Sequence, residues 1–108
     1  ASIAGLDSPP GTIAYNASKA AVHAMTLTMA RDLGPWGIRT CAIAPGSFDT
    51  PMMDAALADQ VPEILAKVPF PNDLLGDPFY FAQLAEHLIR NPLINGETVR
   101  IDGAARLA

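Results

Sequence analysis

The chain has 108 residues, of which 50% are hydrophobic and 17% charged, a composition typical of a compact globular domain and not of a disordered segment. Its net charge is −4 and its seven basic residues are scattered, so there is no basic stripe to follow a nucleic-acid backbone. No apolar run approaches the roughly 20 residues that span a bilayer.

Cysteine usage and the start of the chain set two further expectations. The single cysteine, Cys41, cannot form an internal disulfide and has no Cys or His companions at ligand spacing, so we expect a buried structural thiol and no metal site. A reducing compartment follows, the cytoplasm or, in a eukaryote, the mitochondrial matrix. The first motif begins at once and without a methionine, which suggests a fragment of a longer protein.

The most regular predicted element is a helix over residues 13–33. A turn at residues 9–11 precedes it, Thr12 is a candidate N-cap, and Gly34-Pro35 ends it. Trp36 is expected to cover the end of this helix at the surface. Two helix faces are expected to pack, one with larger side chains and one with alanines: Ser18, Val22, Met25, Met29 and Leu33, and Ala17, Ala20, Ala21 and Ala24.

The rest of the chain alternates strands with helices. Residues 38–44 predict a buried parallel strand. Residues 47–75 hold four prolines among apolar side chains and predict short helical pieces in a mobile apolar flap, with Asp49 and Asp54 solvated. Asp77 and Pro78 predict the start of a helix over residues 79–90, and residues 97–101 predict a final strand. This order is typical of a doubly wound α/β sheet, whose other strands must lie elsewhere.

Tyr15 and Lys19 carry the clearest chemical signal. They stand four residues apart in the predicted helix, so both side chains emerge on one face. A nearby ammonium group favours the phenolate form, which would let Tyr15 exchange a proton with a substrate oxygen. A bare Y-x-x-x-K more often places the Tyr in a core and the Lys at the surface, so other motifs must decide between the two interpretations.

Those motifs are present. Tyr15-Asn16-Ala17-Ser18-Lys19 resembles the Y-x-A-S-K signature of the short-chain dehydrogenase/reductase family, and Ser2 lies thirteen residues earlier, where the family has its catalytic serine. Pro45-Gly46 followed by Thr50 resembles the family's P-G-x-x-x-T segment, and residues 95–97 and 101–103 resemble its final strand and turn. The resemblance covers essentially the whole chain and implies the C-terminal half of a Rossmann-like doubly wound parallel sheet, with residues 1–108 as its catalytic half.

The resemblance also implies roles for particular residues. Tyr15 would be the general acid/base, Lys19 would support the phenolate and bind the nicotinamide ribose, and Ser2 would orient the substrate oxygen. Segment 45–50 would meet the nicotinamide carboxamide of NAD, with NADP not excluded, and its implied cofactor residues are Pro45, Gly46, Ser47, Phe48 and Thr50. The Gly-rich pyrophosphate turn, the acidic residue that selects NAD and the Asn of the catalytic tetrad belong to an N-terminal half that this sequence lacks.

Four blocks make the chain most similar to the type II 3-hydroxyacyl-CoA dehydrogenase subgroup: residues 30–33, 43–46, 68–71, and 95–97 with 100–104. This similarity implies a small acyl-CoA-like substrate, an acyl chain in the apolar flap, and a homotetramer formed through the alanine-rich helix and the final strand. Phe79-Tyr80-Phe81 and Pro9-Pro10 depart from the subgroup pattern and leave the chain-length preference open. His23 and His87 are interpreted as structural or surface residues, Met25 and Met29 as packing residues, and Met52 and Met53 as nearer the substrate.

Two alternatives stay open. One is an NADPH-dependent 3-oxoacyl carrier-protein reductase, which shares Ser2, Tyr15, Lys19 and the Pro-Gly segment. The other is a non-catalytic fragment or assembly module of such an enzyme, because these 108 residues alone are expected to be inactive.

Overall fold

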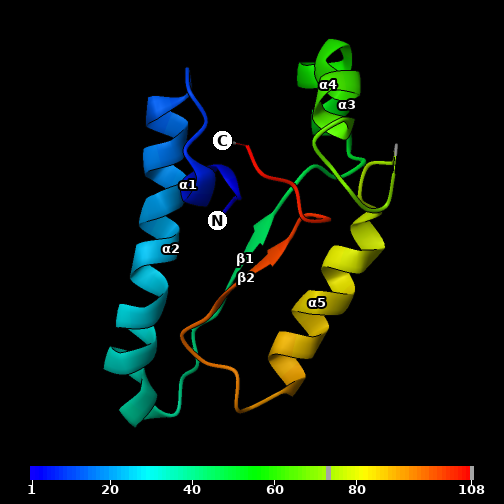
Figure 1. Ribbon diagram of the computed structural model, residues 1–108. Coiled ribbons are helices and arrows are strands. Elements are labelled where there is room, and N and C mark those ends of the chain that lie inside the picture. The colour runs from blue at the N-terminus through cyan, green and yellow to red at the C-terminus, as the bar shows by residue number, and fades with distance from the viewer. Residues whose placement is uncertain (73, 108) are drawn as a thin grey trace.

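The computed structural model describes residues 1–72 and 74–107, so position 73, inside the expected flap, and position 108 lie outside the described residues. In chain order the elements are α1 (Ala4–Asp7), α2 (Ile13–Leu33), the 3-10 helix η1 (Gly34–Trp36), β1 (Ala42–Pro45), α3 (Pro51–Leu57), the 3-10 helix η2 (Ala58–Gln60), α4 (Val61–Leu65), α5 (Pro78–Arg90) and β2 (Thr98–Ile101). Figure 1 shows the strands between α2 and α5, with α3 and α4 projecting beyond the end of β1. The fold class is α/β, as predicted.

The long helix α2 has the predicted bounds, but its start differs in detail. Thr12 stands at the N-cap position without capping the helix: its hydroxyl donates to the Pro9 carbonyl at 3.2 Å and to the Asn16 side-chain oxygen at 2.9 Å. The Asn16 amide also donates to the Pro9 carbonyl, at 2.8 Å. The helix start is therefore fixed by the preceding turn and not by a Thr12 side-chain cap.

Helix α2 ends at Leu33, as predicted, and the 3-10 helix η1 adds a further turn directly after it. Gly34 keeps helical angles, η1 continues the coil, and Gly37 changes its direction with a φ of 76°, which glycine adopts without steric cost. Trp36 lies on η1 with 80% of its surface exposed, so it covers little of the helix end. The predicted Gly34-Pro35 turn is part of η1, because Pro35, in the first turn of η1, is compatible with helical angles.

The face of α2 that packs also differs from the expected stripe. Its buried residues are Thr26 and Ala30, whereas Met25 and Met29 of the stripe remain 50% and 42% exposed. Among the alanines, Ala20 meets α1, and Ala17, Ala21 and Ala24 are exposed. Hydrophobicity alone favoured the larger side chains, but small residues allow the closer approach.

The helix α1 was not expected. It is a single turn of four residues, and a segment so short has no detectable periodicity. Gly5 allows it to lie directly on α2, because a Cβ at this position would be only 2.6 Å from the backbone nitrogen of Ala20. The structure thereby brings the start of the chain against the first half of α2.

The two strands pair in parallel, with Ala42 opposite Thr98 and Pro45 opposite Ile101. The predicted strand over residues 38–44 is therefore shorter at its start and one residue longer at its end. The reason lies at Asn95, whose side-chain oxygen accepts the Thr40 N–H at 2.9 Å in place of a strand partner. The predicted final strand is confirmed, starting one residue later at Thr98.

The flap forms the helical pieces α3, η2 and α4, as the prolines suggested. Thr50 caps α3 by accepting the Met53 N–H, and Pro51 occupies the first turn. Asp77 caps α5 as predicted, its carboxylate accepting the Phe79 N–H at 2.8 Å. Within the described ranges, none of the helices is long and apolar enough to cross a bilayer.

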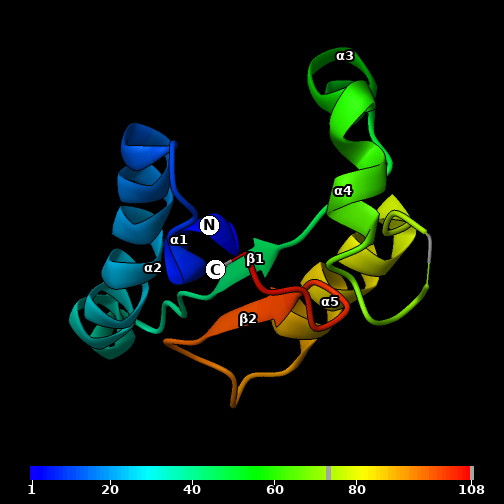
Figure 2. The ribbon, with the colours of Figure 1, turned by 45° about the horizontal axis from the view of Figure 1, so that its top comes forward.

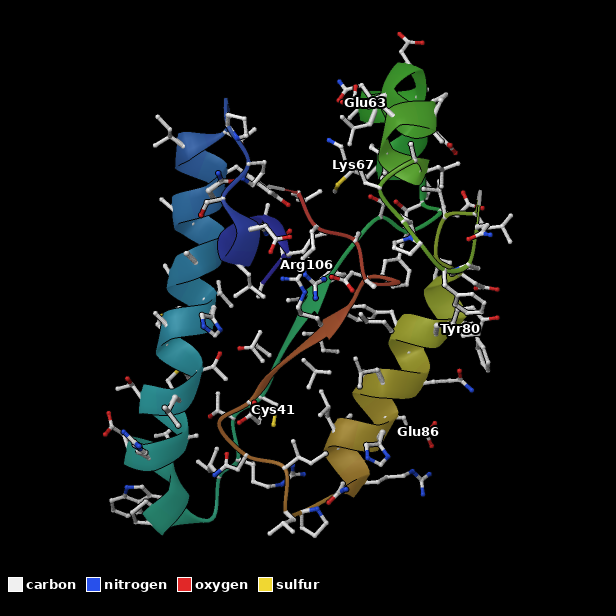
Figure 3. All side chains as sticks on the ribbon, in the orientation of Figure 1. Cys41, Glu63, Lys67, Tyr80, Glu86 and Arg106 are labelled. Atoms are coloured by element: carbon white, nitrogen blue, oxygen red, sulfur yellow. The ribbon has the colours of Figure 1, made fainter. Side chains whose placement is uncertain are left out.

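Arg39 joins the sheet to the far end of α5. Its guanidinium donates to the carbonyls of Leu88, Ile89 and Ile94 at 2.7 to 3.0 Å, which supplies partners for the last turn of the helix. Gly37, Arg39, Cys41 and Ile43 face α5 on this side of the sheet, and Figure 3 shows Cys41 there. The Cys41 thiol was expected to be buried but is only half-buried, and it lies 3.4 Å from the Ile94 carbonyl.

We expect Arg39→Met to lower the free energy of unfolding of the complete protein by about 2 to 3 kcal/mol, because it leaves three carbonyls without a charged donor. Urea unfolding at neutral pH measures this. Arg90→Met is the matched control, since Arg90 is 77% exposed and pairs with Glu86 one turn earlier, and it should cost less than about 0.5 kcal/mol. Equal losses in the two variants would contradict the assigned role of Arg39.

Candidate active site

A cavity of about 630 Å³ lies beyond the carboxyl end of β1, lined by residues of α1 and α2 on one side and of the flap helices on the other. Ligands of open α/β sheets bind at this end of the strands. The cavity gathers side chains and backbone from both ends of the chain and from its middle. All but one of the residues predicted for the site line it: Ser2, Tyr15, Pro45, Gly46, Ser47, Phe48 and Thr50.

The remaining predicted residue, Lys19, lies beside Tyr15. Its ammonium nitrogen is 5.4 Å from the centre of the tyrosine ring, close enough for a cation–π interaction, and its side chain is half-buried. Tyr15 is 50% exposed on the cavity side. One turn of α2 therefore presents the phenol to the cavity with a positive charge next to its ring.

Ser2 is held at the start of α1. Its hydroxyl oxygen accepts the Ala4 N–H at 3.2 Å, and the neighbouring Ile3 N–H donates to the Pro45 carbonyl at 3.2 Å. Accepting a bond through its oxygen leaves the hydroxyl hydrogen available to a ligand in the cavity. Ser2 is therefore connected, through the hydrogen bond of its neighbour Ile3, to the end of β1 and the segment that follows it.

Segment 45–50 forms the wall next to the strand ends. The Gly46 N–H donates to Ile101 at 3.0 Å, and a Cβ at Gly46 would lie 2.9 Å from that of Asp102, so the backbone packs closely against β2. Gly76 holds the segment from the other side: its carbonyl accepts the Asp49 N–H at 2.9 Å and its N–H donates to the Ser47 carbonyl at 3.0 Å. Within residues 1–72 and 74–107 no hydrogen bond engages the Phe48 N–H, which remains available to a ligand.

The opposite wall is apolar and comes from the flap and α5. Met52, Met53, Leu57 and Ile64 line it, so both flap methionines lie at the cavity. Phe81 of α5 also lines it and meets the ring of Phe48 edge-on, with 6.1 Å between ring centres. Sequence reasoning noted Phe81 only as an unusual aromatic residue.

Sequence reasoning also missed a charged cluster between the end of α1 and the end of β2. Arg100 donates to both carboxylate oxygens of Asp7, at 2.7 and 3.0 Å, and to Asp102 at 2.8 Å. The Leu107 N–H donates to Asp7 at 3.0 Å, and Figure 2 shows the C-terminal segment returning beside α1. Asp7 and Arg100 stand 93 positions apart, so spacing in one sequence gives no signal for this pair.

Hydrogen bonds from Arg100 hold the pKa of the Asp7 carboxyl at about 2, below its usual range, and the same bonds raise the pKa of Arg100. A lowered folded-state pKa contributes stability above about pH 4 that is lost as the pH falls toward 2. We expect this carboxyl to account for a loss on the order of 1 to 2 kcal/mol over that window. Urea unfolding gives the free energy of unfolding of the complete protein and of Asp7→Asn at each pH, and the two free energies should converge as the pH falls. A constant difference between them down to pH 2 would contradict this.

The remaining candidates are structural or exposed. His23 lies 2.9 Å from the Thr98 hydroxyl and links α2 to β2, and His87 contacts Asn91 at 3.3 Å, which agrees with their predicted structural roles. Asp49 and Asp54 are exposed, as expected. Across the part of the chain that the structure describes, no three His, Cys, Asp or Glu side chains gather as they would around a metal ion.

Comparisons with known proteins agree with this geometry. The short chain dehydrogenase family model matches residues 1–61. The "3-hydroxyacyl-CoA dehydrogenase type-2" of Drosophila melanogaster is 55% identical over 99% of this chain and 42% of its own length. The crystal structure of 3-hydroxyacyl-CoA dehydrogenase type-2 from Mycobacterium avium has a TM-score of 0.91 and 44% identity over 100% of this chain and 42% of that chain.

A third match is the crystal structure of 3-oxoacyl-[acyl-carrier protein] reductase from Brucella melitensis, with a TM-score of 0.87 and 32% identity over 100% of this chain and 41% of that chain. The chain thus spans about two fifths of the length of the proteins it matches. The family model, the Drosophila melanogaster relative and the two crystal structures agree on one assignment. The chain belongs to the short chain dehydrogenase family.

Proposed function

We propose that the protein carrying this chain transfers hydride between NAD and a 3-hydroxyacyl-CoA, forming the 3-oxoacyl-CoA, or the reverse. One observation supports this most strongly. Ser2, Tyr15 and segment 45–50 line a single cavity, with the Lys19 ammonium beside the tyrosine ring. The pattern implied by the resemblance is therefore a spatial arrangement in this chain and not only a spacing in its sequence.

The described residues fit a nicotinamide ring at the strand ends. The unengaged Phe48 N–H and the Thr50 hydroxyl, which uses only its oxygen to cap α3, offer donors suited to a carboxamide. Enzymes of this family use NAD or NADP, which when bound accepts or supplies the hydride. Lys19 lies behind Tyr15 and would reach the ribose hydroxyls, while the pyrophosphate contacts would come from chain outside this sequence.

Tyr15 is the proton-transfer group of this mechanism. In the oxidative direction its phenolate takes the proton of the substrate hydroxyl as the hydride leaves the carbon, and in the reductive direction it returns that proton. The Lys19 ammonium stabilises the phenolate electrostatically. Ser2 donates its hydroxyl hydrogen to the substrate oxygen and so fixes that oxygen next to Tyr15.

The apolar wall supports an acyl substrate. Met53, Leu57 and Ile64 come from helices separated by the short η2, and Phe81 closes the wall from α5. Burying a methylene in such a wall contributes about 0.8 kcal/mol, so the wall sets the preference for chain length. The names of the two type-2 relatives point to the same substrate class.

The specificity of this wall is testable at Phe81. We expect Phe81→Ala to raise the ratio of kcat/KM for medium-chain over short-chain 3-hydroxyacyl-CoA by about tenfold, because removing the ring extends the apolar cavity. Phe79→Ala is the matched control on the same helix, since Phe79 is 61% exposed and does not line the cavity. An unchanged ratio in Phe81→Ala, with the protein folded, would place the acyl chain elsewhere.

We further propose that residues 1–108 are the C-terminal half of one larger domain, which assembles as a homotetramer in the cytoplasm or a mitochondrial matrix. Large apolar side chains remain open to solvent, Ile13 at 86% and Leu93 at 91%, which supports packing against further chain. Met25 and Met29 on α2 give a surface for subunit contact. Light scattering of the complete protein tests the assembly, and a monomer would contradict it.

The direct test of the activity is a substrate panel on the complete protein. With NAD and 3-hydroxybutyryl-CoA we expect NADH to form, measured by its absorbance, and with acetoacetyl-CoA and NADH we expect the reverse. Absence of turnover in both directions across short, medium and long acyl-CoA substrates would refute the proposal.

A second candidate, an NADPH-dependent reductase of 3-oxoacyl groups on a carrier protein, has support from the fold match to the Brucella melitensis reductase. The site described above serves both reactions, so cofactor and carrier separate them. A preference for NADPH, together with faster turnover of acyl-carrier-protein thioesters than of the CoA thioesters, would favour this second candidate.

A further inference from the structure

We propose that Asp7 and Arg100 are positioning residues that set the place of Ser2 relative to Tyr15. This inference rests on the proposed function, because it concerns the serine of that site. It draws on contacts between the start of the chain and its last strand. The sequence motifs gave no sign that these two segments are in contact.

Helix α1 cannot hold its own position. It has four residues, and an isolated turn of helix is unstable in water. Ser2 lies two residues before its first residue, and the Ser2 hydroxyl oxygen accepts the N–H of Ala4, which begins α1. Any displacement of α1 therefore moves the Ser2 hydroxyl.

Three contacts fix α1. At its start the Ile3 N–H donates to Pro45 at 3.2 Å, and along its length Gly5 lies against the backbone of Lys19 and Ala20. At its end the Asp7 carboxylate receives both arms of the Arg100 guanidinium and the Leu107 N–H. A bidentate pair of this kind fixes orientation as well as distance, which a single bond does not.

Arg100 is itself held rigidly. It extends from β2, donates to Asp102 at 2.8 Å and to the Ala105 carbonyl at 2.9 Å, and keeps only 24% of its side chain exposed. Asp7 keeps 9% exposed, so the pair is largely shielded from water. The side chains of Arg100 and Asp7 thus fix the position of α1, and with it Ser2, relative to β2.

Asp7→Asn in the complete protein tests this. The amide keeps the size of the side chain but replaces one acceptor oxygen with a donor facing Arg100 and Leu107. We expect kcat to fall by about tenfold with KM for the cofactor unchanged, because a misplaced catalytic group costs rate and not cofactor affinity. Arg100→Lys keeps the charge but loses the two-armed guanidinium, so it should lower kcat by a smaller factor.

The decisive comparison repeats Asp7→Asn in a Ser2→Ala background. If Asp7 acts through Ser2, the tenfold effect should shrink to less than about twofold once the hydroxyl is absent. A loss that persists undiminished in the Ser2→Ala background, or no loss in Asp7→Asn itself, would overturn the inference. Arg106→Gln is the control, because Arg106 is 59% exposed and contacts Asp102 but not Asp7; Figure 3 shows it beside the end of the sheet.

Failure of the inference and failure of the proposed function give different results. Ser2→Ala with a rate like that of the wild type would remove the serine role and the inference together. A large loss in Ser2→Ala with no loss in Asp7→Asn would overturn only the inference. Where Asp7→Asn fails to fold by circular dichroism, Arg100→Lys in both backgrounds provides the same comparison.

Discussion

Replacing Tyr15 with phenylalanine in the complete protein should lower kcat by about 10²- to 10⁴-fold. The change removes only the hydroxyl that exchanges a proton with the substrate, and the ring and its contact with the Lys19 ammonium stay in place. Cofactor affinity should therefore change little. Steady-state formation of NADH measures the first effect, and cofactor fluorescence titration measures the second.

The other tyrosine provides the matched control. Tyr80 lies on α5, is 56% exposed and does not line the main cavity, so Tyr80→Phe should keep kcat within about twofold. Rates for Tyr15→Phe close to those of the wild type would show that another group transfers the proton. Equal losses in both variants would point to a general effect on folding.

Gly5→Ala should be the most damaging single-methyl addition near the site. Its Cβ would lie 2.6 Å from Ala20 N and Lys19 C, which are backbone atoms of α2 that cannot move aside alone. We expect a loss of about 1 to 3 kcal/mol in the free energy of unfolding, the range for overpacked sites. Displacement of α1 would also move Ser2, so kcat should fall by about tenfold or more.

Gly34→Ala is the control for Gly5→Ala. Gly34 has helical angles, and a Cβ added there would meet no atom within 4 Å, so alanine should leave stability unchanged or raise it by up to about 1 kcal/mol. Urea unfolding and kcat are measured on both variants. A Gly5→Ala protein as stable and active as the Gly34→Ala protein would contradict the close packing of α1 on α2.

Local sequence signals predicted the elements that have local causes. The bounds of α2 followed from a long run of helix formers between two turns, and the start of α5 followed from the Asp77 cap, which the structure confirms. The strand over residues 38–44 was only partly right, because Asn95, far along the chain, takes the Thr40 N–H that a strand partner would have used. No local pattern encodes that competition.

The site shows the same division. Motif spacing predicted which residues would meet, and all of them line one cavity except Lys19, which lies beside the Tyr15 ring. Their chemical roles stay predictions. What spacing could not supply was the support for Ser2: α1 is too short for periodicity, and the hydrogen bonds that Arg100 donates to Asp7 join residues 93 positions apart.

Transfer of deuterium from substrate to cofactor tests the central claim most directly. The complete protein is given NAD and 3-hydroxybutyryl-CoA deuterated at the carbon that bears the hydroxyl, and the products are analysed by mass spectrometry. Hydride transfer within one site predicts that the deuterium is recovered in the NADH and that the proton of the hydroxyl is released. Deuterium found in the solvent, or an oxidised product formed without labelled NADH, would contradict the account.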